Sequence, residues 1–267
     1  MPQRLSPLPH ILADASSLEV TLLIPAKNSA HALESTVLEA REFFGKNFSD
    51  SYEIILIPNP GNDKNDLSTE IANKLSARFS EVKVVLHEGA PGKGAALRTG
   101  IQRARGRMIF FTDADLPYDL EFFSRAHAKL QEGYHLVTGN RRMASSQFDI
   151  PVELLNVAYG RHRLGLGFNR VVRLFFPVET TDTQAGIKAM SRELAREAFS
   201  RLECPGFFFD LEIFLTARAK KMKQTDLPVL LFLNTEKSTV RIIRESFLAA
   251  YWLSRIFIRQ LKGVYAQ

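Results

Sequence analysis

Short apolar runs alternate with longer amphipathic stretches along the first half of the chain. The runs are rich in Val, Ile, Leu and Phe and are bounded by Gly, Pro, Asn or Asp, which is typical of buried strands. They cover residues 19–24, 52–57, 82–86, 108–111 and 134–138. The stretches that follow predict helices over residues 29–44, 64–79, 94–104 and 119–132. This rhythm predicts an α/β fold, with a mostly parallel, twisted sheet flanked by helices.

The pattern changes after residue 142. Residues 143–180 mix arginines with aromatic residues, and three glycines in this stretch loosen any helix that forms there. If a helix does form, Arg163, Arg170 and Arg173 share one of its faces. The remaining pattern predicts helices near 191–201 and 207–222, a strand at 227–233 and a terminal helix at 241–262. We therefore expect a flexible arm over residues 1–17, one domain over 18–240 and a C-terminal amphipathic helix within 241–267.

Composition narrows the class of partner. A net charge of +6 and a pI near 9.5 favour anionic partners, such as nucleotide diphosphates, lipid phosphates, a membrane surface or nucleic acid. Cys204 is the single cysteine, which excludes a disulfide framework and fits a reducing, cytoplasmic compartment. No stretch without charged residues is longer than nine residues, far below the roughly 20 that span a bilayer.

Two carboxylates follow the strand at 108–111. Asp113 and Asp115 stand where a parallel strand delivers side chains to the crevice beyond its carboxyl end. Two acids spaced i, i+2 in an extended segment point the same way and can share a divalent cation with a diphosphate. A solvated turn explains the same two residues, because an Asp-x-Asp pattern alone has low specificity.

Three further loops converge on this crevice. Pro25, Ala26 and Asn28 follow the first strand, residues 59–63 follow the second, and Lys93 stands in a Gly-rich turn before a helix. A nucleotide can lay its base against the first two loops, while Lys93 and Asp113 approach its ribose or phosphate. Alternatively, the glycines around Lys93 only permit a tight turn. The turn is neither a Walker A loop nor a Gly-x-Gly-x-x-Gly fingerprint.

Six motifs, in order, resemble those of glycosyltransferase family 2 of the GT-A type, and within it the dolichyl-phosphate or polyprenyl-phosphate glucosyl- and mannosyltransferases. They are residues 24–28 (IPAKN), 92–100 (GKGAALRTG), 113–115 (DAD), 138–141 (TGNR), 182–188 (DTQAGIK) and 209–212 (FDLE). The last two narrow the resemblance to the lipid-phosphate branch. The resemblance implies a GT-A fold and an inverting hexosyltransferase that uses a UDP-sugar or GDP-sugar, a polyprenyl phosphate, and Mg²⁺ or Mn²⁺.

The resemblance also implies roles for individual residues. Asp113 and Asp115 would hold the metal ion, and Asp115, Asp210 and Glu212 form the expected catalytic set. The expected donor-binding residues are Pro25, Ala26, Asn28, Asn59, Lys93, Asp113, Ala114 and Arg141. The expected acceptor-binding residues are Arg161, Arg163, Asp182 and Gln184, because guanidinium groups can hold a phosphate bidentately. Lys188 is expected to contact a phosphate or a neighbouring carboxylate.

Several of these residues also have structural explanations. Arg161 and Arg163 fit a solvated basic face, and Asp210 and Glu212 fit the start of a helix, where acids interact favourably with the dipole. The chain also departs from the family pattern. Its second loop reads Asn-Pro-Gly-Asn at 59–62 instead of Asp-Asp-Gly-Ser, so Asn59 or Asp63 is left to contact the base. Lys27, Ser29 and Pro117 replace other residues that are common in the family.

The terminal helix places Arg244, Arg255, Arg259 and Lys262 along one stripe beside apolar residues. Such a helix lies either at a bilayer interface or packed on the domain, and a lipid acceptor favours peripheral membrane contact. An inert relative that binds nucleotide, lipid or protein is the alternative to an enzyme, because of the altered second loop. A family 2 enzyme with a soluble acceptor is another, and nucleic acid is not an expected partner.

Overall fold

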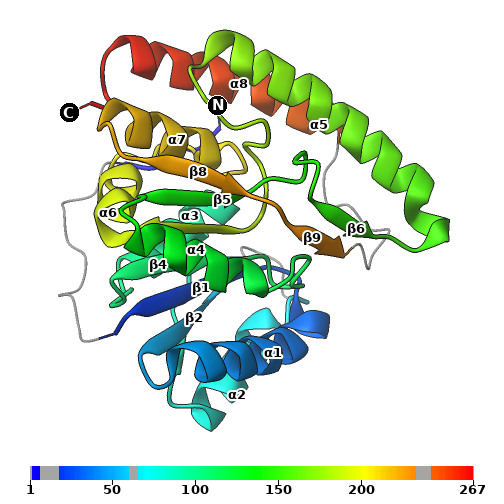
Figure 1. Ribbon diagram of the computed structural model, residues 1–267, viewed down its shortest axis with the longest axis vertical. Coiled ribbons are helices and arrows are strands. Elements are labelled where there is room, and N and C mark those ends of the chain that lie inside the picture. Colours follow the sequence, from blue (N-terminus) through cyan, green and yellow to red (C-terminus); the bar gives the residue numbers. More distant parts are fainter. Residues whose placement is uncertain (1, 7–17, 60–64, 233–241, 267) are drawn as a thin grey trace.

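The computed structural model describes residues 2–6, 18–59, 65–232 and 242–266, and its centre is a seven-stranded sheet in the order β3-β2-β1-β4-β7-β5-β8 (Figure 1). The strands are β1 (Val20–Ala26), β2 (Tyr52–Pro58), β3 (Val82–Val84), β4 (Met108–Phe111), β5 (Leu136–Gly139), β7 (Lys188–Ser191) and β8 (Gln224–Leu227). Only β7 runs antiparallel to its neighbours β4 and β5. The predicted mostly parallel sheet is confirmed.

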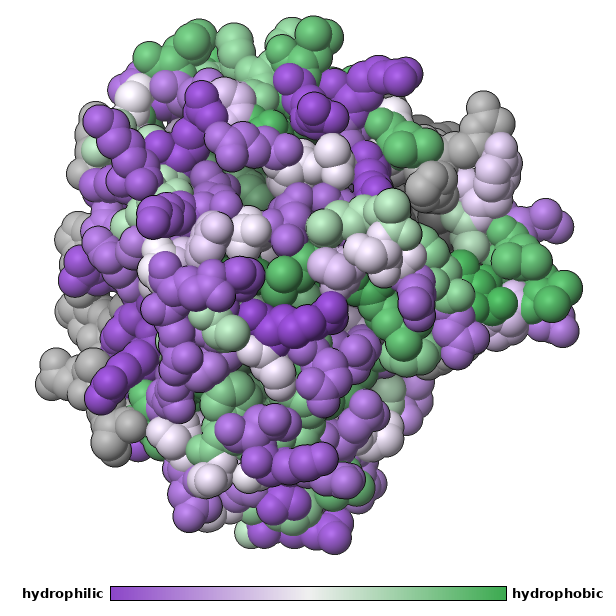
Figure 2. Space-filling view, viewed as in Figure 1, coloured by the Kyte–Doolittle hydropathy of each residue, from purple (hydrophilic) through white to green (hydrophobic). Residues whose placement is uncertain are grey.

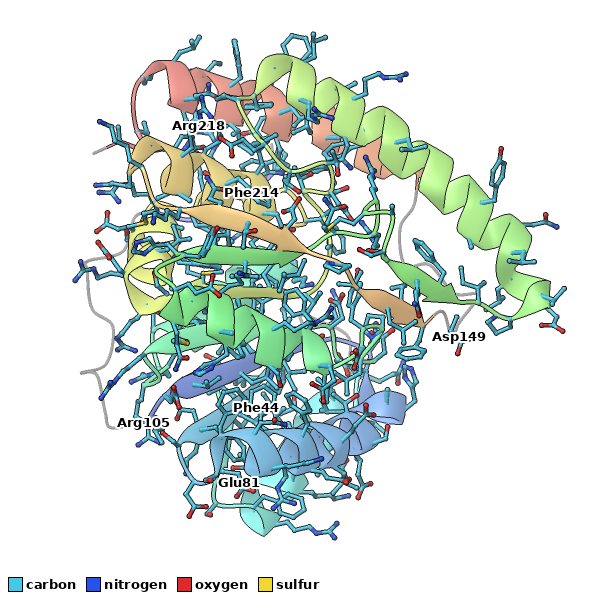
Figure 3. All side chains as sticks on the ribbon, viewed as in Figure 1. Phe44, Glu81, Arg105, Asp149, Phe214 and Arg218 are labelled. Carbon is cyan, nitrogen blue, oxygen red and sulfur yellow. The ribbon has the colours of Figure 1, made fainter. Side chains whose placement is uncertain are left out.

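Helices cover both faces of this sheet. They are α1 (Ala30–Phe48), α2 (Ser68–Arg78) and α4 (Glu121–Gln131) on one face, and α3 (Lys93–Ile101), α6 (Arg192–Ser200) and α7 (Phe209–Ala219) on the other. Phe44 of α1 and Phe214 of α7 lie on opposite sides of the sheet (Figure 3).

Strand β4 shows why these runs are apolar at every position. Phe110 points into the first layer and stacks on Phe123, with ring centroids 5.0 Å apart, whereas Ile109 and Phe111 point into the second layer. All three are fully buried, and each such side chain contributes roughly 1.5–3 kcal/mol. The strand is therefore fixed firmly, and so is the point at which its carboxyl end leaves the sheet.

Strands β6 (Gln147–Asp149), β7 and β8 were not predicted from the sequence. Strand β7 has the sequence KAMS and β8 has QTDL, and neither carries the apolar run that marks a buried strand. The expected strand at 227–233 is instead the end of β8 followed by β9 (Leu230–Phe232), which pairs with β6 (Gln147–Asp149) in a small second sheet. These segments are strands because neighbouring strands pair with them, and not because their own sequences carry an apolar pattern.

Residues 155–175 form one continuous helix, α5 (Leu155–Phe175), which follows a short 3-10 turn, η1 (Val152–Leu154). Its inner face packs Val172 and the following Phe176 against α7 and against α8 (Ile242–Leu261). Each glycine costs a helix roughly 1 kcal/mol. Gly160 and Gly167 have open space around them, so they lie away from the packed face and weaken the helix without disturbing its contacts.

The described part of α8 packs on the domain. Its Trp252 and Ile256 are buried beside α5 and α7. Arg255 and Arg259 pair with the carboxylate of Glu203, at 2.9 and 2.6 Å. These cations therefore point at the protein and not at lipid headgroups, while Arg244 lies outside the described side chains. No described helix is long and apolar enough to cross a membrane.

The first residues of the chain contact the same region, although a flexible arm was expected over 1–17. The amide of Leu5 donates to the carbonyl of Glu203, at 3.0 Å, and Arg98 donates to the carbonyl of Ser6. Burial lowers the pKa of Arg98 to about 10. Residues 2–6 are therefore docked, and the rest of the expected arm lies outside the described residues.

Candidate active site

The first two strands bring their terminal loops together as expected. Ala26 pairs with Pro58 at the ends of β1 and β2, and the amide of Asn59 donates to the carbonyl of Ala26, at 2.9 Å. Asn28 has a positive φ of 53°, and its amide donates to Asp66 Oδ2 at 2.8 Å. Asp66 thus holds the turn that contains the donor-binding candidates Pro25 and Asn28, a role that the sequence analysis missed.

Asn59 links this edge to the Gly-rich turn. Its Nδ2 donates to the carbonyl of Gly92, at 3.2 Å, whereas its buried Oδ1 has no hydrogen-bond partner among the described residues. A buried acceptor without a partner is costly, so it suits a site where a ligand donates. Asp63, the other candidate for contacting a base, lies outside the described residues.

Lys93 and Asp113 meet beyond the carboxyl end of β4. Lys93 is the first residue of α3, and its Nζ lies 2.6 Å from Asp113 Oδ1. Burial acts to lower the pKa of Lys93, but the carboxylates of Asp113 and Asp210 outweigh it and raise the pKa. The predicted convergence of the Gly-rich turn on the Asp-x-Asp segment is therefore present.

Asp115 is the more exposed of the two carboxylates. Partial desolvation and then the negative charge of Asp113 raise its pKa. Ala114 between them is buried, and its carbonyl accepts from Thr36 Oγ1 at 2.7 Å, which fixes the turn. Leu116 follows with a positive φ of 40°. Two nearby like charges and a constrained turn fit a divalent cation.

A metal ion here would need further ligands. Within the described ranges, no three His, Cys, Asp or Glu side chains are grouped closely enough to hold a metal by themselves. Mg²⁺ commonly binds through one or two carboxylates together with substrate phosphates and water. Asp113 and Asp115 fit this type of site, in which the ion arrives with its phosphate ligand.

A second ion pair lies beside the first. Strand β7 places Lys188 opposite Phe111 of β4, and Lys188 Nζ lies 2.8 Å from Asp210 Oδ1. Burial lowers the pKa of Lys188 and raises that of Asp210. The expectation that Lys188 contacts a carboxylate is confirmed. We call Lys93, Asp113, Lys188 and Asp210 the charged cluster.

Glu212 lies outside the charged cluster. On a helix, residues two positions apart do not share a face, so Asp210 and Glu212 point in different directions. Glu212 Oε2 accepts from the amides of Glu203 and Cys204, at 3.1 and 2.9 Å, and its Oε1 accepts from the hydroxyl of Tyr265, at 3.0 Å. These contacts hold Glu212 within the fold, and the catalytic role that the resemblance implies for it stays a prediction.

The loop at residues 203–205, which Glu212 holds, contacts the Gly-rich turn and the start of α3. The carbonyl of Pro205 accepts from the amide of Ala95 in the first turn of α3, at 3.0 Å. A Cβ on Gly92 would lie 2.1 Å from the same carbonyl oxygen, so only glycine permits this approach. The Gly-rich turn is therefore positioned by residues 203–205 and, through Glu212, by the C-terminal segment.

Arg141 and Asp182 form a bidentate pair. Arg141 Nε and Nη2 lie 2.7 and 2.8 Å from the two oxygens of Asp182, which is fully buried. Burial opposes both charges, but Arg141 lowers the pKa of Asp182, and the pKa of Arg141 is raised by Tyr118 and Asp182. The pair holds the TGNR turn against the DTQ segment, where Gln184 is partly exposed.

Gly186 and Tyr118 are site residues for which sequence reasoning gave no role. A Cβ on Gly186 would lie 2.0 Å from Asp113 Oδ2, so this glycine makes room for the carboxylate. The amide of Gly186 donates to the hydroxyl of the buried Tyr118, at 3.2 Å. Tyr118 follows Leu116 and Pro117 in the turn after β4. Its closeness in sequence to the Asp-x-Asp segment is the feature that could have marked it as a site residue.

The expected acceptor role of two arginines remains without a structural outcome. The side chains of Arg161 and Arg163 lie outside the described residues, so their acceptor role stays a prediction.

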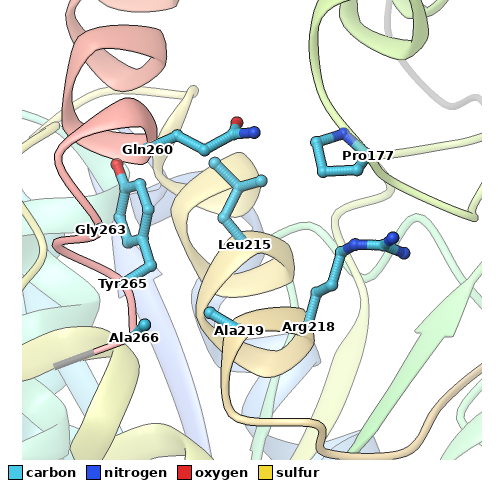
Figure 4. A pocket seen from close by; sticks show the side chains of 8 residues that line it. All are labelled: Pro177, Leu215, Arg218, Ala219, Gln260, Gly263, Tyr265 and Ala266. Atoms are coloured by element: carbon cyan, nitrogen blue, oxygen red, sulfur yellow. The ribbon is translucent and has the colours of Figure 1, made fainter.

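A separate cavity of about 260 Å³ lies among Pro177, α7 and the end of α8 and is lined by Leu215, Arg218 and Gln260 (Figure 4). None of its lining residues belongs to the predicted site.

Solved structures with a similar architecture identify the fold. The chain aligns with mannosyl-3-phosphoglycerate synthase from Rubrobacter xylanophilus at a TM-score of 0.58 and 16% identity, covering 92% of this chain and 74% of that one. It aligns with glucosyl-3-phosphoglycerate synthase from Mycobacterium tuberculosis, in complex with UDP, at a TM-score of 0.54 and 19% identity, covering 84% and 74%. The fold is that of the GT-A glycosyltransferases, as expected.

The sequence gives the family. Residues 21–199 match the model of glycosyl transferase family 2. The chain belongs to this family and is a glycosyltransferase.

Relatives include glycosyltransferase AglD from Haloferax volcanii, which is 28% identical over 221 residues. This match covers 81% of the chain but only 34% of AglD. A dolichyl-phosphate beta-glucosyltransferase from Drosophila melanogaster is 27% identical over 232 residues, covering 82% of the chain and 68% of the relative. The chain therefore spans about a third of one relative and about two thirds of the other.

Proposed function

We propose that the protein transfers a hexose, with inversion, from a UDP-sugar or GDP-sugar to a polyprenyl or dolichyl phosphate at the cytoplasmic face of a membrane. The observation that carries the proposal is the pair Asp113 and Asp115 at the carboxyl end of β4, with Lys93 Nζ 2.6 Å from Asp113. Membership of the family and the names of the dolichyl-phosphate relatives support the reaction class and the acceptor.

The departing group of such a donor is a nucleoside diphosphate, and its growing negative charge must be neutralised. A Mg²⁺ or Mn²⁺ ion held by Asp113 and Asp115 would supply Lewis-acid stabilisation of that diphosphate. Lys93 is close enough to the same carboxylate to add a fixed positive charge beside it. Asn59, whose Oδ1 meets no donor in the described part of the chain, is the candidate for accepting a hydrogen bond from the donor base.

The acceptor phosphate is already an anionic nucleophile, so it needs positioning by cations more than it needs a strong base. Arg161 and Arg163 on α5 are the candidates for this role, whereas Arg141, which Asp182 holds rigidly, remains a donor-binding candidate. In this proposal Asp210, which is paired with Lys188, is the candidate for orienting the sugar. Gln184 lies in the DTQ segment beside Asp182 and completes the proposed acceptor side.

A transfer assay tests the proposal. Radiolabelled UDP-glucose and GDP-mannose are offered in turn with polyprenyl phosphate and Mg²⁺ or Mn²⁺, and lipid-linked sugar is measured. We expect product with one donor, loss of product with EDTA, and at least a hundredfold loss in Asp115→Ala. Glu132→Ala, which removes an exposed salt bridge to Lys129, is the matched control and keeps full activity.

The same transfer assay, together with calorimetry, distinguishes two alternative functions from the proposed one. A transferase with a soluble acceptor would label 3-phosphoglycerate and not the lipid. An inert relative, which the altered loop at 59–62 suggests, would bind nucleotide in calorimetry but form no product with any acceptor. Absence of lipid-linked product from a folded protein with every common donor would refute the proposed function.

A further inference from the structure

The outer face of α5 is an exposed apolar stripe. Leu155, Tyr159, Leu166 and Leu174 are all 43% or more exposed, and the spacing of the first three returns them to one side of the helix. Val152, just before the helix, is 78% exposed. The helix projects beyond the main body of the molecule, and hydrophobic residues gather over its projecting end (Figures 1 and 2). We call Leu155, Tyr159, Leu166 and Leu174 the outer stripe.

The stripe is not needed to hold the helix in place. On the inner face Val172 is buried, and Phe168 packs on Phe208 with ring centroids 5.5 Å apart. Asn169 is also buried, and its Oδ1 accepts from both the amide and the hydroxyl of Thr183, at 3.1 and 3.0 Å. The inner face therefore fixes α5 to the core and to the DTQ segment, and leaves the leucines of the stripe facing outward.

The charge on α5 is of one sign. The helix contains four arginines and no Asp or Glu. Arg170 and Arg173 are exposed, and their spacing from Leu166 places them along the same side as the stripe. The exposed acids Asp149 and Glu153 precede the helix, and Glu179 follows it, so they bound the basic surface without entering it.

A helix that exposes leucines and a tyrosine among arginines fits the boundary between headgroups and acyl chains. Apolar side chains gain by leaving water, and each arginine near an anionic surface contributes roughly 1 kcal/mol. A protein groove would accept the leucines equally well, but the absence of any acid on α5 favours a surface of uniform negative charge.

We propose that α5 docks the protein on an anionic bilayer, with the outer stripe, Arg170 and Arg173 against the lipid. The proposed function supplies only the reason for a membrane; the docking surface itself follows from α5. Arg142 connects that surface to the site, because its guanidinium lies over Gly165 of α5 and it follows Arg141 in sequence. Docking would thus bring headgroup phosphates to the edge of the site that holds Arg141 and Asp182.

Vesicle sedimentation tests the docking surface without any need for catalysis. The full chain is mixed with vesicles of equimolar phosphatidylcholine and phosphatidylglycerol, or of phosphatidylcholine alone. The triple variant Leu155→Ser, Leu166→Ser, Leu174→Ser is compared with Ile258→Ser, Leu261→Ser, which removes the exposed apolar residues of α8. Near-ultraviolet circular dichroism and calorimetric nucleotide binding establish that each variant is folded.

We expect the wild-type protein to bind the anionic vesicles, the α5 variant to bind at least about tenfold more weakly, and the α8 variant to bind like wild type. Arg170→Gln, Arg173→Gln should lose most of the preference for phosphatidylglycerol. Wild-type protein that ignores anionic vesicles, or an α8 variant that alone loses binding, would overturn the proposal. So would a wild-type dimer that the α5 variant converts to a monomer.

These outcomes are distinct from failure of the proposed function. If α5 docks on vesicles but no sugar reaches polyprenyl phosphate, the docking surface stands and the reaction is wrong. If detergent-dispersed polyprenyl phosphate is glycosylated equally by wild type and by the α5 variant while neither binds vesicles, the reaction stands and the docking surface is wrong.

Discussion

Gly186→Ala should disturb the geometry of the site while leaving the stability of the fold nearly unchanged. The added Cβ would lie 2.0 Å from Asp113 Oδ2, whereas ordinary contact begins near 3.4 Å. The carboxylate must therefore move by about 1.4 Å, which also breaks its 2.6 Å contact with Lys93. A misplacement of roughly 1 Å at a reacting centre can cost about a hundredfold in rate.

The fold should tolerate the same change. The two nearest atoms belong to the end of the short Asp113 side chain and not to backbone, so a rotation of Asp113 relieves the main clash at a cost of roughly 0.5–1.5 kcal/mol. The third, Tyr118 Cε2 at 3.3 Å, needs to shift by only about a tenth of an ångström. For a chain of this size such a loss lowers Tm by only about 1–6 °C, at about 2–4 °C for each kcal/mol. We thus expect near-normal melting together with a loss of about a hundredfold in kcat/KM.

The assay is sugar transfer under the metal conditions of the wild-type enzyme, with melting followed by circular dichroism. Gly45→Ala is the control, because its Cβ would meet only Tyr52 Oη, at 3.7 Å. In an Asp113→Ala background, Gly186→Ala should add no further loss, since the two changes act through one carboxylate. Activity of Gly186→Ala within a few-fold of wild type would refute the reasoning.

Three further predictions concern the packing around the site. Asp182→Ala leaves the guanidinium of Arg141 without its buried partner and should cost about 3–5 kcal/mol in urea unfolding, whereas Glu179→Ala on an exposed pair should cost less than about 1 kcal/mol. Trp252→Ala should cost about 3–5 kcal/mol and Leu261→Ala less than about 0.5, and equal effects would contradict the packing of α8. Tyr265→Phe removes a hydrogen bond to a buried carboxylate and should cost about 1.5–3 kcal/mol, and an unchanged urea midpoint would count against it.

The sequence was most informative where strands are buried on both faces. The apolar runs of β1, β2 and β4 are typical of the centre of a parallel sheet, so the edge at which their loops meet followed from the pattern, whereas the order of the strands within the sheet did not. That edge is where Lys93 and Asp113 meet.

Polar or glycine-containing segments could not be assigned in this way. Lys188 in β7 and Asp226 in β8 face partners that come from distant parts of the chain, Asp210 and Thr138, so local sequence carries no strand signal there. The glycines of α5 argued against a helix, and its contacts with α7, α8 and the DTQ segment stabilise one.

The divergence of Asp210 and Glu212 was readable from helical geometry, since positions i and i+2 do not share a face. The role of Gly186 was not, because it depends on a close approach between two loops that are separated by more than seventy residues.

The most direct test of the central claim is calorimetric binding of UDP, GDP and their glucose and mannose conjugates, with and without Mn²⁺, to the wild-type protein and to Asp115→Asn. The account predicts that one nucleotide sugar binds in a Mn²⁺-dependent manner and that Asp115→Asn loses this dependence while keeping its melting temperature. Equal binding by the variant, or donor binding that is indifferent to the metal, would contradict it.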